Sequence, residues 1–356
     1  MRVALLGVGL IGGSIGLAAR ERLGAHVSGW DPVAGTLTDA LRRGAVDQAC
    51  ADAEQACRDA EIAWVAAPVG ALSSAIDAAL RNAPRGCVVS DVGSTKRTLV
   101  AGRSDERFVG GHPLAGAETA GVQHARADLF DGATWYLTPA AGTSGVLYER
   151  LHRAIAGLGA QPAAIDPELH DRLMATVSHL PHVLANVLVA QAASALDAGG
   201  PLPATGPSFR DATRVAGASS TIWTDIYLAN RDALLERIDE TLARLGEVRE
   251  MFSAADRDSI TSWNEAARAD RNALLSAGAG ERDELHELRA SVPNRPGVIA
   301  EIALVLGRAG VNIVDLALSP SPDNSQGQVA LWVRGEQHAA RAAQLVGGLG
   351  IPVVRA

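Results

Sequence analysis

The chain of 356 residues is poor in cysteine and in lysine, and has few aromatic residues and no long apolar run. Its three cysteines, Cys50, Cys57 and Cys87, show no metal-ligand spacing, and so sparse and odd a set indicates a reducing compartment. No apolar run approaches the roughly 20 residues needed to span a bilayer, and the N-terminus has no signal-peptide layout. The net charge of −8 comes without a basic stripe. We therefore expect a cytoplasmic protein that binds neither metal, nor membrane, nor nucleic acid.

Lysine occurs once, as Lys96, among 32 basic residues. We attribute the arginine bias to the genome and not to function, but it makes the place of this one lysine worth following. Hydrophobic residues make up 47% of the chain, which is typical of a soluble globular protein. The length is too great for one ordinary hydrophobic core, so two or three domains are expected.

A glycine-rich turn follows the first apolar run, Val3-Ala4-Leu5-Leu6. It reads Gly7-Val8-Gly9-Leu10-Ile11-Gly12 and leads into a helix-compatible stretch, a second apolar stretch and an acid, Asp31. In such a fingerprint the first glycine permits the tight turn, the second lets the backbone approach a pyrophosphate, and the third lets helix pack on strand. The N–H groups at the helix start then face the phosphates. The alternative is a turn whose glycines serve packing alone.

Asp31 indicates which dinucleotide is bound. A carboxylate at the end of the second strand accepts hydrogen bonds from ribose hydroxyls and repels a 2′-phosphate. No arginine follows Asp31 at once, so NAD is favoured over NADP. The alternative is a turn-forming aspartate before Pro32. The expected cofactor contacts are Gly7, Gly9, Leu10, Ile11, Gly12, Asp31 and Pro68.

Strand and helix patterns alternate over residues 1–165, which predicts an α/β Rossmann domain with a parallel sheet covered on both faces. The expected strands are residues 3–6, 26–30, 62–67, 87–91, 108–109 and 135–137.

Residues 166–278 read as an all-α domain. Asp166-Pro167 is a helix start, and helical sequence runs to about residue 196. After a Gly/Pro-rich loop at 199–207, helices are expected at 220–252 and 254–275. So apolar a helical domain is expected to bury a face against a second copy, which gives a homodimer.

The remaining residues form a third domain. Residues 276–280 read as a linker, and residues 285–356 follow the ferredoxin-like order βαββαβ.

Ligands of an open α/β sheet bind beyond the carboxyl ends of its strands. Ser94 and Lys96 follow the fourth expected strand, His112 follows the fifth, and Pro68 ends the third. His112 is a candidate general base because imidazole titrates near neutrality; the alternative is a loop histidine bonded to a carbonyl. Ser94 is interpreted as the N-cap of a helix near Thr95, as a ligand contact, or as both. Lys96 opposes the helix dipole unless an anion binds, and its alternative is a solvated side chain.

Two histidines share a face of the helix that begins at Asp166. His179 and His182 lie one turn apart, with Pro181 between them. Pro181 cannot donate to the carbonyl of Val177, so a kink is expected. The histidines are either functional or core residues, and no third ligand has a spacing that suits a metal.

Arg210 and Arg214 lie between the Gly/Pro-rich loop and the long helix, and Asp211 could pair with one of them. A guanidinium facing a crevice would clamp a carboxylate with two hydrogen bonds. On residues alone, a surface role for both is favoured.

Five blocks in this order resemble the prephenate and arogenate dehydrogenases of tyrosine biosynthesis, and the resemblance covers most of the chain. The blocks are Gly7-Val8-Gly9-Leu10-Ile11-Gly12-Gly13-Ser14, Asp91-Val92-Gly93-Ser94-Thr95-Lys96, Gly110-Gly111-His112-Pro113-Leu114-Ala115-Gly116, Val177-Ser178-His179-Leu180-Pro181-His182 and Phe209-Arg210-Asp211-Ala212-Thr213-Arg214, with Trp223 nine residues later.

The resemblance implies an NAD-dependent oxidative decarboxylation of a cyclohexadienyl substrate. It implies that His112 accepts the proton of the ring hydroxyl and that Ser94 holds hydroxyl and nicotinamide in register. Arg214 would bind a substrate carboxylate, with His182 beside it, and Glu118 matches a substrate-side acid. Lys96 and His179 complete the expected substrate contacts, and the helical domain would be the family's dimerisation domain.

The tail resembles an ACT domain. Residues 293–298 and 310–313 match two turns that commonly contact an amino acid, and they are expected to face each other across a βα turn. The resemblance implies feedback by tyrosine, with Asn294, Gly297, Val298, Asn312 and Ile313 as regulatory contacts. The alternative is a structural module that extends a dimer.

Prephenate is the preferred substrate, and arogenate is the alternative, since no residue decides between a keto group and an amine on the side chain. A 3-hydroxyacid dehydrogenase or imine reductase is a second rival; those hydroxyacid enzymes use a helix-borne lysine, whereas Lys96 lies in the first domain. A third is a catalytically inactive sensor of NAD and an amino acid. The presence of Ser94, His112 and Arg214 argues against it.

Overall fold

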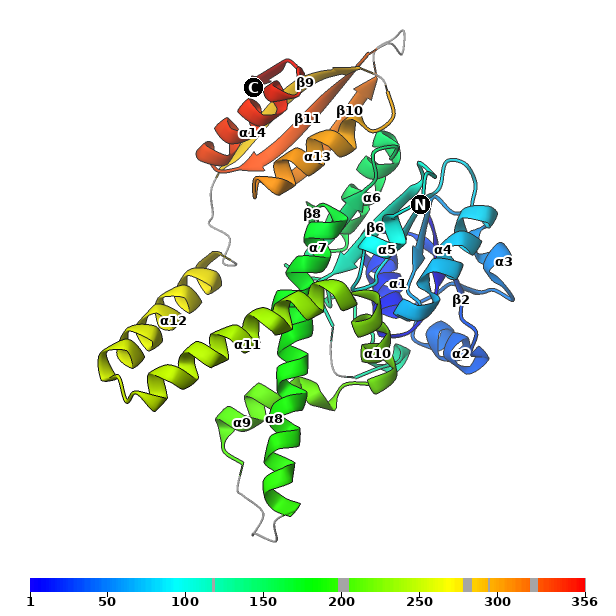
Figure 1. The fold of residues 1–356 in the computed structure, drawn as a ribbon. Helices are drawn as coiled ribbons and strands as arrows, with labels where there is room; N and C mark the ends of the chain where they lie inside the picture. The colour runs from blue at the N-terminus through cyan, green and yellow to red at the C-terminus, as the bar shows by residue number, and fades with distance from the viewer. Residues whose placement is uncertain (117–118, 198–204, 278–283, 294, 321–325, 356) are drawn as a thin grey trace.

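The computed structural model describes residues 1–356 except 117–118, 198–204, 278–283, 294, 321–325 and 356 (Figure 1). It has three parts, which are an α/β domain, an elongated set of helices and a small α/β domain at the C-terminus. This order confirms the predicted succession of a Rossmann domain, a helical domain and a ferredoxin-like domain.

The first part is built on an eight-stranded sheet of order β3-β2-β1-β4-β5-β6-β7-β8. All paired neighbours run parallel except β6 and β7, which are antiparallel because no crossover helix joins them, only a 3-10 turn at Val122–His124. The all-parallel expectation is therefore wrong at this one place. The strands are β1 Arg2–Leu6, β2 His26–Trp30, β3 Gln48–Ala49, β4 Ile62–Val65, β5 Val88–Asp91, β6 Phe108–Pro113, β7 Thr134–Pro139 and β8 Gln161–Ala164.

Two hydrophobic clusters lie on the two faces of this sheet. Successive side chains of a strand point to opposite faces, so Val3 and Leu5 join one cluster while Ala4 and Leu6 join the other. The first face is covered by α1 (Leu10–Leu23) and α6 (Gly145–Gly157). The second is covered by α3 (Ala53–Cys57), α4 (Val69–Asn82) and α5 (Arg97–Val100). A further helix, α2 (Ala34–Arg42), follows β2.

The helical part differs from the expected helices at two points, and both concern the site. The run that begins at Asp166 is α7 (Pro167–Met174), a π-helical turn (Ala175–His179) and α8 (Leu180–Asp197). The π turn precedes Pro181, so the predicted irregularity is a local unwinding of the helix. The helix expected at 220–252 is two helices, α10 (Ser220–Ala229) and α11 (Arg231–Ser253), which break at Asn230.

Three more elements complete this part. They are α9 (Pro207–Thr213), a 3-10 turn (Arg214–Gly217) and α12 (Arg257–Ala277). Of the predicted linker 276–280, residues 276 and 277 belong to α12, and the rest lies outside the described residues.

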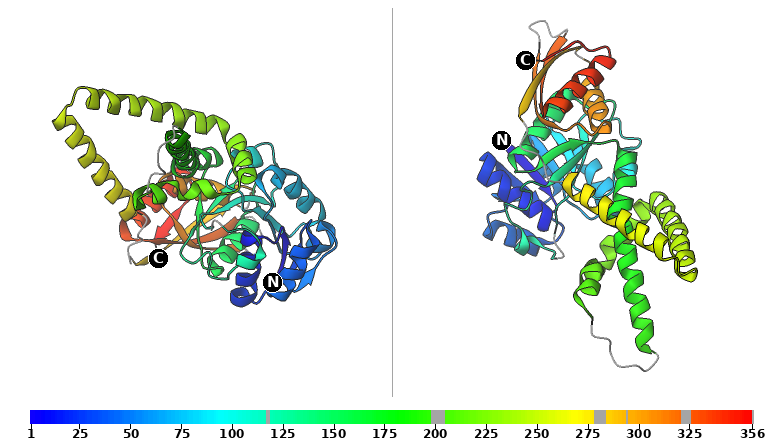
Figure 2. Two further views of the ribbon diagram at one scale, coloured as in Figure 1. Left: turned by 90° about the horizontal axis from the view of Figure 1, so that it is seen from below. Right: turned by 90° about the vertical axis from the view of Figure 1, so that its left-hand side faces the viewer.

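The helical part projects away from the sheet (Figures 1 and 2). It carries many exposed apolar side chains, among them Val187 and Leu188 of α8. By length and composition, the helical run Pro167–Ser194 could cross a membrane. This corrects the expectation that no stretch is apolar enough, although the core helix of a soluble protein has the same length and composition. Only 28% of its most apolar part is buried within one chain. Exposed apolar side chains continue along α11, with Leu242, Leu245 and Phe252.

The C-terminal part is a four-stranded antiparallel sheet of order β10-β11-β9-β12 with two helices. Its elements are β9 Leu285–Pro293, α13 Val298–Arg308, β10 Ile313–Pro320, β11 Gln326–Arg334, α14 Glu336–Gly348 and β12 Val353–Arg355. The two turns expected to face each other lie at opposite ends of α13, about 16 Å apart for an 11-residue helix. That expectation is wrong within one chain, because α13 itself separates Gly297 from Asn312.

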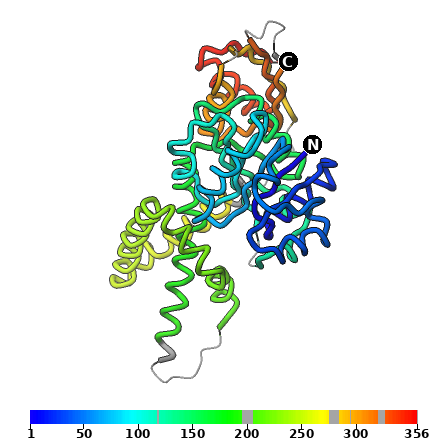
Figure 3. The backbone as a smooth tube through the Cα atoms, turned by 90° about the vertical axis from the view of Figure 1, so that its right-hand side faces the viewer, coloured from blue at the N-terminus to red at the C-terminus, as the bar shows by residue number. Residues whose placement is uncertain are grey.

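This C-terminal part is seated directly on the first domain (Figures 1 and 3). Gly145, Gly297 and Gly307 lie where a Cβ would overlap an atom of the other domain. Across the contact, Gly297 N–H donates to the Thr143 carbonyl (3.2 Å), and the buried ring of His152 lies 3.1 Å from the Ile313 carbonyl oxygen. The two domains share one continuous hydrophobic cluster, so they pack as one body.

Candidate active site

The glycine turn has a different packing requirement at each glycine. A Cβ on Gly7 would overlap the Ala66 carbonyl, and one on Gly12 would overlap the Gly7 carbonyl. Gly7 also has φ of +95°, which disfavours other residues. Gly9, in contrast, has nothing within 4 Å of its Cβ position. Packing therefore explains two of the three glycines, and the backbone at Gly9 is open to a phosphate group.

Asp31 ties this turn to the end of β2. Its Oδ2 accepts from Val8 N–H and its Oδ1 accepts from Val33 N–H, both at 2.9 Å. The carboxylate thus forms a turn around Pro32 and holds the glycine turn at once, while remaining partly exposed. Leu10 and Ile11 begin α1 and pack on the core, and Pro68 is the exposed N-cap of α4 at the end of β4.

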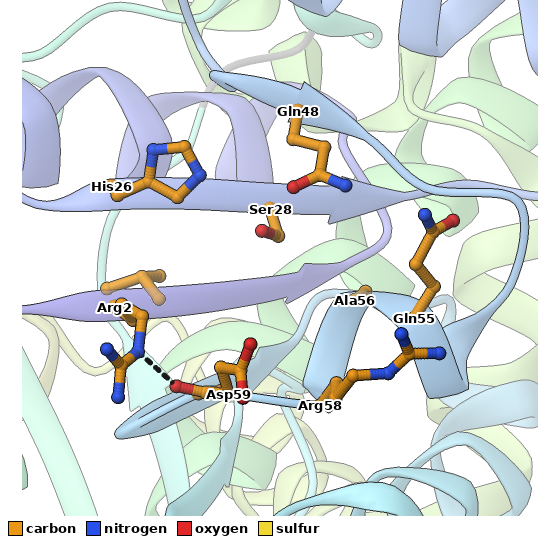
Figure 4. Close-up of a pocket in the computed structure, with 10 residues that line it drawn as sticks. Arg2, His26, Ser28, Gln48, Gln55, Ala56, Arg58 and Asp59 are labelled. Carbon is orange, nitrogen blue, oxygen red and sulfur yellow. Dashed lines mark hydrogen bonds between the residues drawn. The ribbon is translucent and has the colours of Figure 1, made fainter.

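The opposite edge of the sheet holds a separate polar pocket of about 260 Å³ (Figure 4). Its lining includes the first residues of three strands, which are Arg2 of β1, His26 of β2 and Gln48 of β3. The Arg2 guanidinium donates to the Asp59 carbonyl at 2.7 Å. Because this pocket lies away from the carboxyl ends of the strands, it is not part of the site predicted there.

His112 lies near the carboxyl end of β6. The two glycines before it, Gly110 and Gly111, let β5 and Lys96 approach the backbone of β6 closely. A Cβ on Gly110 would overlap Thr138, and one on Gly111 would overlap Asp91. Asp91 accepts from Gly111 N–H at 3.1 Å and from Gly93 N–H at 2.8 Å. It also pairs with the ammonium of Lys96, and both side chains are fully buried.

This buried pair settles the interpretation of the single lysine. The alternative of a solvated Lys96 is wrong, because its side chain is 0% exposed. Its charge is compensated by Asp91 inside the protein, and burial is the largest influence on its pKa, which it lowers. Lys96 therefore holds β5 and β6 together beneath His112.

His112 belongs to a hydrogen-bonded chain that crosses from the first domain into α7. Its Nδ1 lies 2.9 Å from Nε2 of His170, and Nδ1 of His170 lies 2.8 Å from Oδ1 of Asp171. A carboxylate only accepts, so Nδ1 of His170 carries the proton and its Nε2 has a lone pair when neutral. Nδ1 of His112 must then donate. The remaining lone pair of His112 is on Nε2, the atom left to act on a ligand.

The electrostatics of this chain favour a neutral base. Burial lowers the pKa of His112 well below 6.5, and the neighbouring His170 lowers it further. Burial also lowers the pKa of His170, against the opposing effect of Asp171. His112 is therefore unprotonated at neutral pH and able to accept a proton.

Asp171 also binds the start of α5, close to Ser94 in the sequence. Its Oδ1 accepts from Lys96 N–H at 2.7 Å and its Oδ2 from Arg97 N–H at 2.9 Å, so it serves the start of α5. The interpretation of Ser94 as N-cap is wrong, because α5 begins at Arg97. Within the described part of the chain, the buried Ser94 Oγ has no hydrogen-bond partner, which leaves it available to a ligand.

The second wall of the site comes from α8 and α10. The ring of His182 stacks on Trp223, with centroids 3.6 Å apart and planes 9° apart, and its Nδ1 bonds the Tyr227 hydroxyl. His179 meets the edge of Trp223 at a centroid distance of 6.1 Å. The two predicted histidines are thus brought together with His112 and His170, since His179 is close enough to influence the pKa of His112.

Arg214 and Glu118 are less closely defined. Arg214 is exposed and begins a 3-10 turn that packs against α8, the helix of His182. Arg210 is exposed at the end of α9. Glu118 and Asn294 lie outside the described residues. The sequence alone did not identify His170, Asp171, Tyr227 or Asn230 as site residues. One signal could have indicated Asp171, because it lies eight residues before His179 on one face of a helix with a proper N-cap.

Models of known families match three consecutive stretches of the chain. Residues 15–163 match the nucleotide-binding domain of prephenate dehydrogenase, residues 166–265 its dimerization domain, and residues 286–339 an ACT domain.

Individual relatives agree with the family models. The prephenate dehydrogenase of Bacillus subtilis (strain 168) is 30% identical over 360 residues, or 97% of this chain and 95% of that protein. The structure of prephenate dehydrogenase from A. aeolicus in complex with hydroxyphenyl propionate and NAD+ gives a TM-score of 0.70 at 26% identity, covering 77% of this chain and 98% of the other. The structure of Synechocystis arogenate dehydrogenase gives a TM-score of 0.67 at 25% identity, covering 77% of this chain and 100% of the other. Matched along nearly its whole length, the chain belongs to the prephenate dehydrogenase family.

Proposed function

We propose that the protein converts prephenate to 4-hydroxyphenylpyruvate by NAD-dependent oxidative decarboxylation, in the biosynthesis of tyrosine. The observation that carries the proposal is the chain from Asp171 through His170 to His112, which leaves the lone pair of a neutral His112 on Nε2. A base oriented in this way suits removal of a hydroxyl proton.

The glycine turn and Asp31 fit a dinucleotide. The backbone at Gly9 has room for a pyrophosphate at the start of α1, and the partly exposed Asp31 carboxylate at the end of β2 can accept hydrogen bonds from a ribose. NAD, when bound there, supplies the acceptor for a hydride. Because Asp31 is anionic, NAD is preferred over NADP.

The residues around His112 then have distinct roles. Nε2 of His112 accepts the proton of the ring hydroxyl while the carbon that bears this hydroxyl loses its hydride. The ring carboxylate leaves as CO2. The positive charge that forms on His112 is stabilised through the His170 ring by Asp171. His112 returns the proton to the phenol oxygen, so no net proton is released. Ser94 holds the hydroxyl, and Arg214, with His182, binds a substrate carboxylate.

Arogenate is the second candidate substrate, since a relative of similar fold is an arogenate dehydrogenase. The test is a side-by-side assay of prephenate and arogenate at equal concentrations, with NADH formation as the readout. We expect prephenate to give the higher kcat/KM. A higher value for arogenate would make arogenate the substrate, and no turnover of either would refute the proposed function.

We also propose that two copies pair through the helical domain. The support is the apolar surface of α8 and α11, which one chain leaves uncovered, together with the family's dimerization domain. Light scattering without detergent should give twice the mass of 36.8 kDa. Replacing both Leu242 and Leu245 by glutamate should shift the mass toward one chain. A monomeric wild-type protein would contradict the proposal.

We propose finally that tyrosine inhibits the enzyme through the C-terminal domain. A cavity of about 240 Å³ lies where β9 and α13 meet the loop before α6, and it includes apolar and polar side chains such as Val298, Leu318 and Gln328. This cavity suits an amino acid with an apolar body. From here a route leads to the base, because Arg308 of α13 pairs with Asp166 at 3.0 Å and Asp166 caps α7, the helix of His170.

A further inference from the structure

We infer that Asn230 is a positioning residue, which holds His179 as the neutral tautomer with its proton on Nε2 so that His179 donates to an anionic oxygen of the substrate. The inference rests on the proposed function for its substrate. It is carried by the contacts of Asn230 with Asp171 and His179 at the break between α10 and α11.

Asn230 occupies a helix N-cap without capping the helix. It is the N-cap of α11, where an asparagine side chain ordinarily accepts from a backbone N–H of the first turn. Here, as far as the described residues show, the side chain makes no such bond. It points instead into the protein, where Asn230 is 0% exposed. The Asn230 amide therefore does not cap the helix and is free to bond other groups inside the protein.

The bonds of this amide define its orientation. Nδ2 of Asn230 lies 2.7 Å from the Asp171 carbonyl oxygen and 3.1 Å from Nδ1 of His179. A carbonyl oxygen only accepts, so the atom facing Asp171 must be the NH₂ group, whose second hydrogen is directed at His179. Nδ1 of His179 therefore accepts, and in the neutral ring the proton must be on Nε2.

Nε2 of His179 is a buried hydrogen-bond donor without an acceptor among the described residues. His179 is 0% exposed. An unpaired buried N–H is unfavourable, so such a group is expected where a ligand accepts its hydrogen bond. The ring lies beside Trp223 and near His112, in the wall of the site already described.

The groups facing His179 keep it uncharged. Burial lowers its pKa to about 4, and His170 and His182 act in the same direction, against Asp171, which favours protonation. The Asn230 NH₂ acts in the same direction, because a proton on Nδ1 would face another donor. A neutral donor can orient an anionic oxygen of the substrate without the strong binding of the ground state that a cation would add.

The first test uses Asn230→Asp, which keeps the size of the side chain but replaces its donor by an acceptor. His179 must then bind through an Nδ1 proton, and its Nε2 loses the donor unless the ring becomes charged. We expect kcat to fall about 10–100-fold, the range for loss of one hydrogen bond to a charged group, with little change in the Kd for NAD measured by calorimetry.

The matched control is His179→Gln, whose amide N–H lies near the former Nε2 but has no tautomers. Because His179 is a group of the site, this variant is expected to lower kcat itself, and its kcat is the reference for the double variant. Adding Asn230→Asp to His179→Gln should lower kcat by less than about twofold more. A merely structural Asn230 would instead give the same fold-loss in both backgrounds, and that result would overturn the inference.

A direct measurement needs neither turnover nor a folded Asn230 variant. Long-range ¹H–¹⁵N spectra of the wild-type protein report ring tautomers, and the signals of His179 are those absent from His179→Gln. We expect an Nε2-protonated neutral ring at pH 7. An Nδ1-protonated or charged ring would refute the inference even if the protein turned over prephenate, and the expected ring would uphold it even if another substrate were found.

Discussion

Nδ1 of His112 lies 2.9 Å from Nε2 of His170, and this contact joins two domains at the candidate active site. His112 belongs to β6 of the Rossmann domain, whereas His170 belongs to α7 of the helical domain. The proposed base is therefore oriented by a residue that the nucleotide-binding domain does not contain. Any change that moves α7 relative to the sheet should alter catalysis before it alters NAD binding.

Replacing Asp171 by asparagine tests the far end of this chain. Asp171 accepts from His170 and from two backbone N–H groups at the start of α5, and an amide cannot accept with its NH₂ side. We expect kcat to fall by about 10–100-fold and unfolding to become easier by about 1–3 kcal/mol.

Urea denaturation and steady-state kinetics, both measured where the variant is fully folded, separate the two effects. Asp47→Asn is the control, because Asp47 also accepts a backbone N–H, from Val27, but lies at the other edge of the sheet. A loss of stability without loss of kcat in Asp171→Asn would confine Asp171 to a structural role.

Asp31→Ser and Asp31→Asn should both narrow the preference for NAD over NADP, since each removes the charge that repels a 2′-phosphate. Asparagine can still accept the Val8 N–H that Asp31 accepts at 2.9 Å, so it should retain more activity with NAD than serine does. The ratio of kcat/KM for the two cofactors is the measurement. Equal use of both cofactors by the wild-type protein would show that Asp31 does not select NAD.

The buried histidines predict a pH dependence of stability. The pKa of His179 is lowered by burial from 6.5 to about 4 in the folded protein. Between these values the unfolded chain binds more protons, so stability is present above about pH 6.5 and decreases as the pH falls toward 4. Melting temperatures measured from pH 7 to 4 should decrease, and less steeply for His179→Gln. Equal slopes would mean that His179 titrates normally.

Arg308→Ala tests the route from the C-terminal domain to the base. Arg308 pairs with Asp166 in the helical domain, whereas Arg355 pairs with Glu336 inside the C-terminal domain and provides the control. Inhibition curves with tyrosine should shift to higher concentrations for Arg308→Ala and stay unchanged for Arg355→Ala. If both respond as wild type does, regulation does not pass through this pair.

Truncation of the C-terminal domain is not a clean test of regulation by tyrosine. Residues such as Ile299 and Leu306 belong to the same hydrophobic cluster as the first domain. Their removal would expose that cluster and reduce stability for reasons unrelated to tyrosine.

The parts of the site that the sequence predicted are those set by local pattern. The glycine turn, Asp31 and His112 follow directly from strand ends, so their places could be inferred from the order of elements. His170 and Asp171 act through contacts between domains, and no spacing in the chain predicts that α7 lies against α5. Asn230 acts through contacts between helices of one domain that lie far apart in the sequence. The break at Asn230 was missed for a related reason, since the apolar pattern of α11 is continuous with that of α10.

In the proposed reaction, a neutral His112 removes the hydroxyl proton during oxidative decarboxylation. The most direct measurement is a parallel assay of NADH, CO2 and 4-hydroxyphenylpyruvate formed from prephenate by wild type and by His112→Asn. We expect a 1:1:1 ratio for wild type, and for the variant a kcat about 10²–10⁴-fold lower with an unchanged Kd for NAD. NADH without CO2, or a variant within about threefold of wild type, would contradict the account.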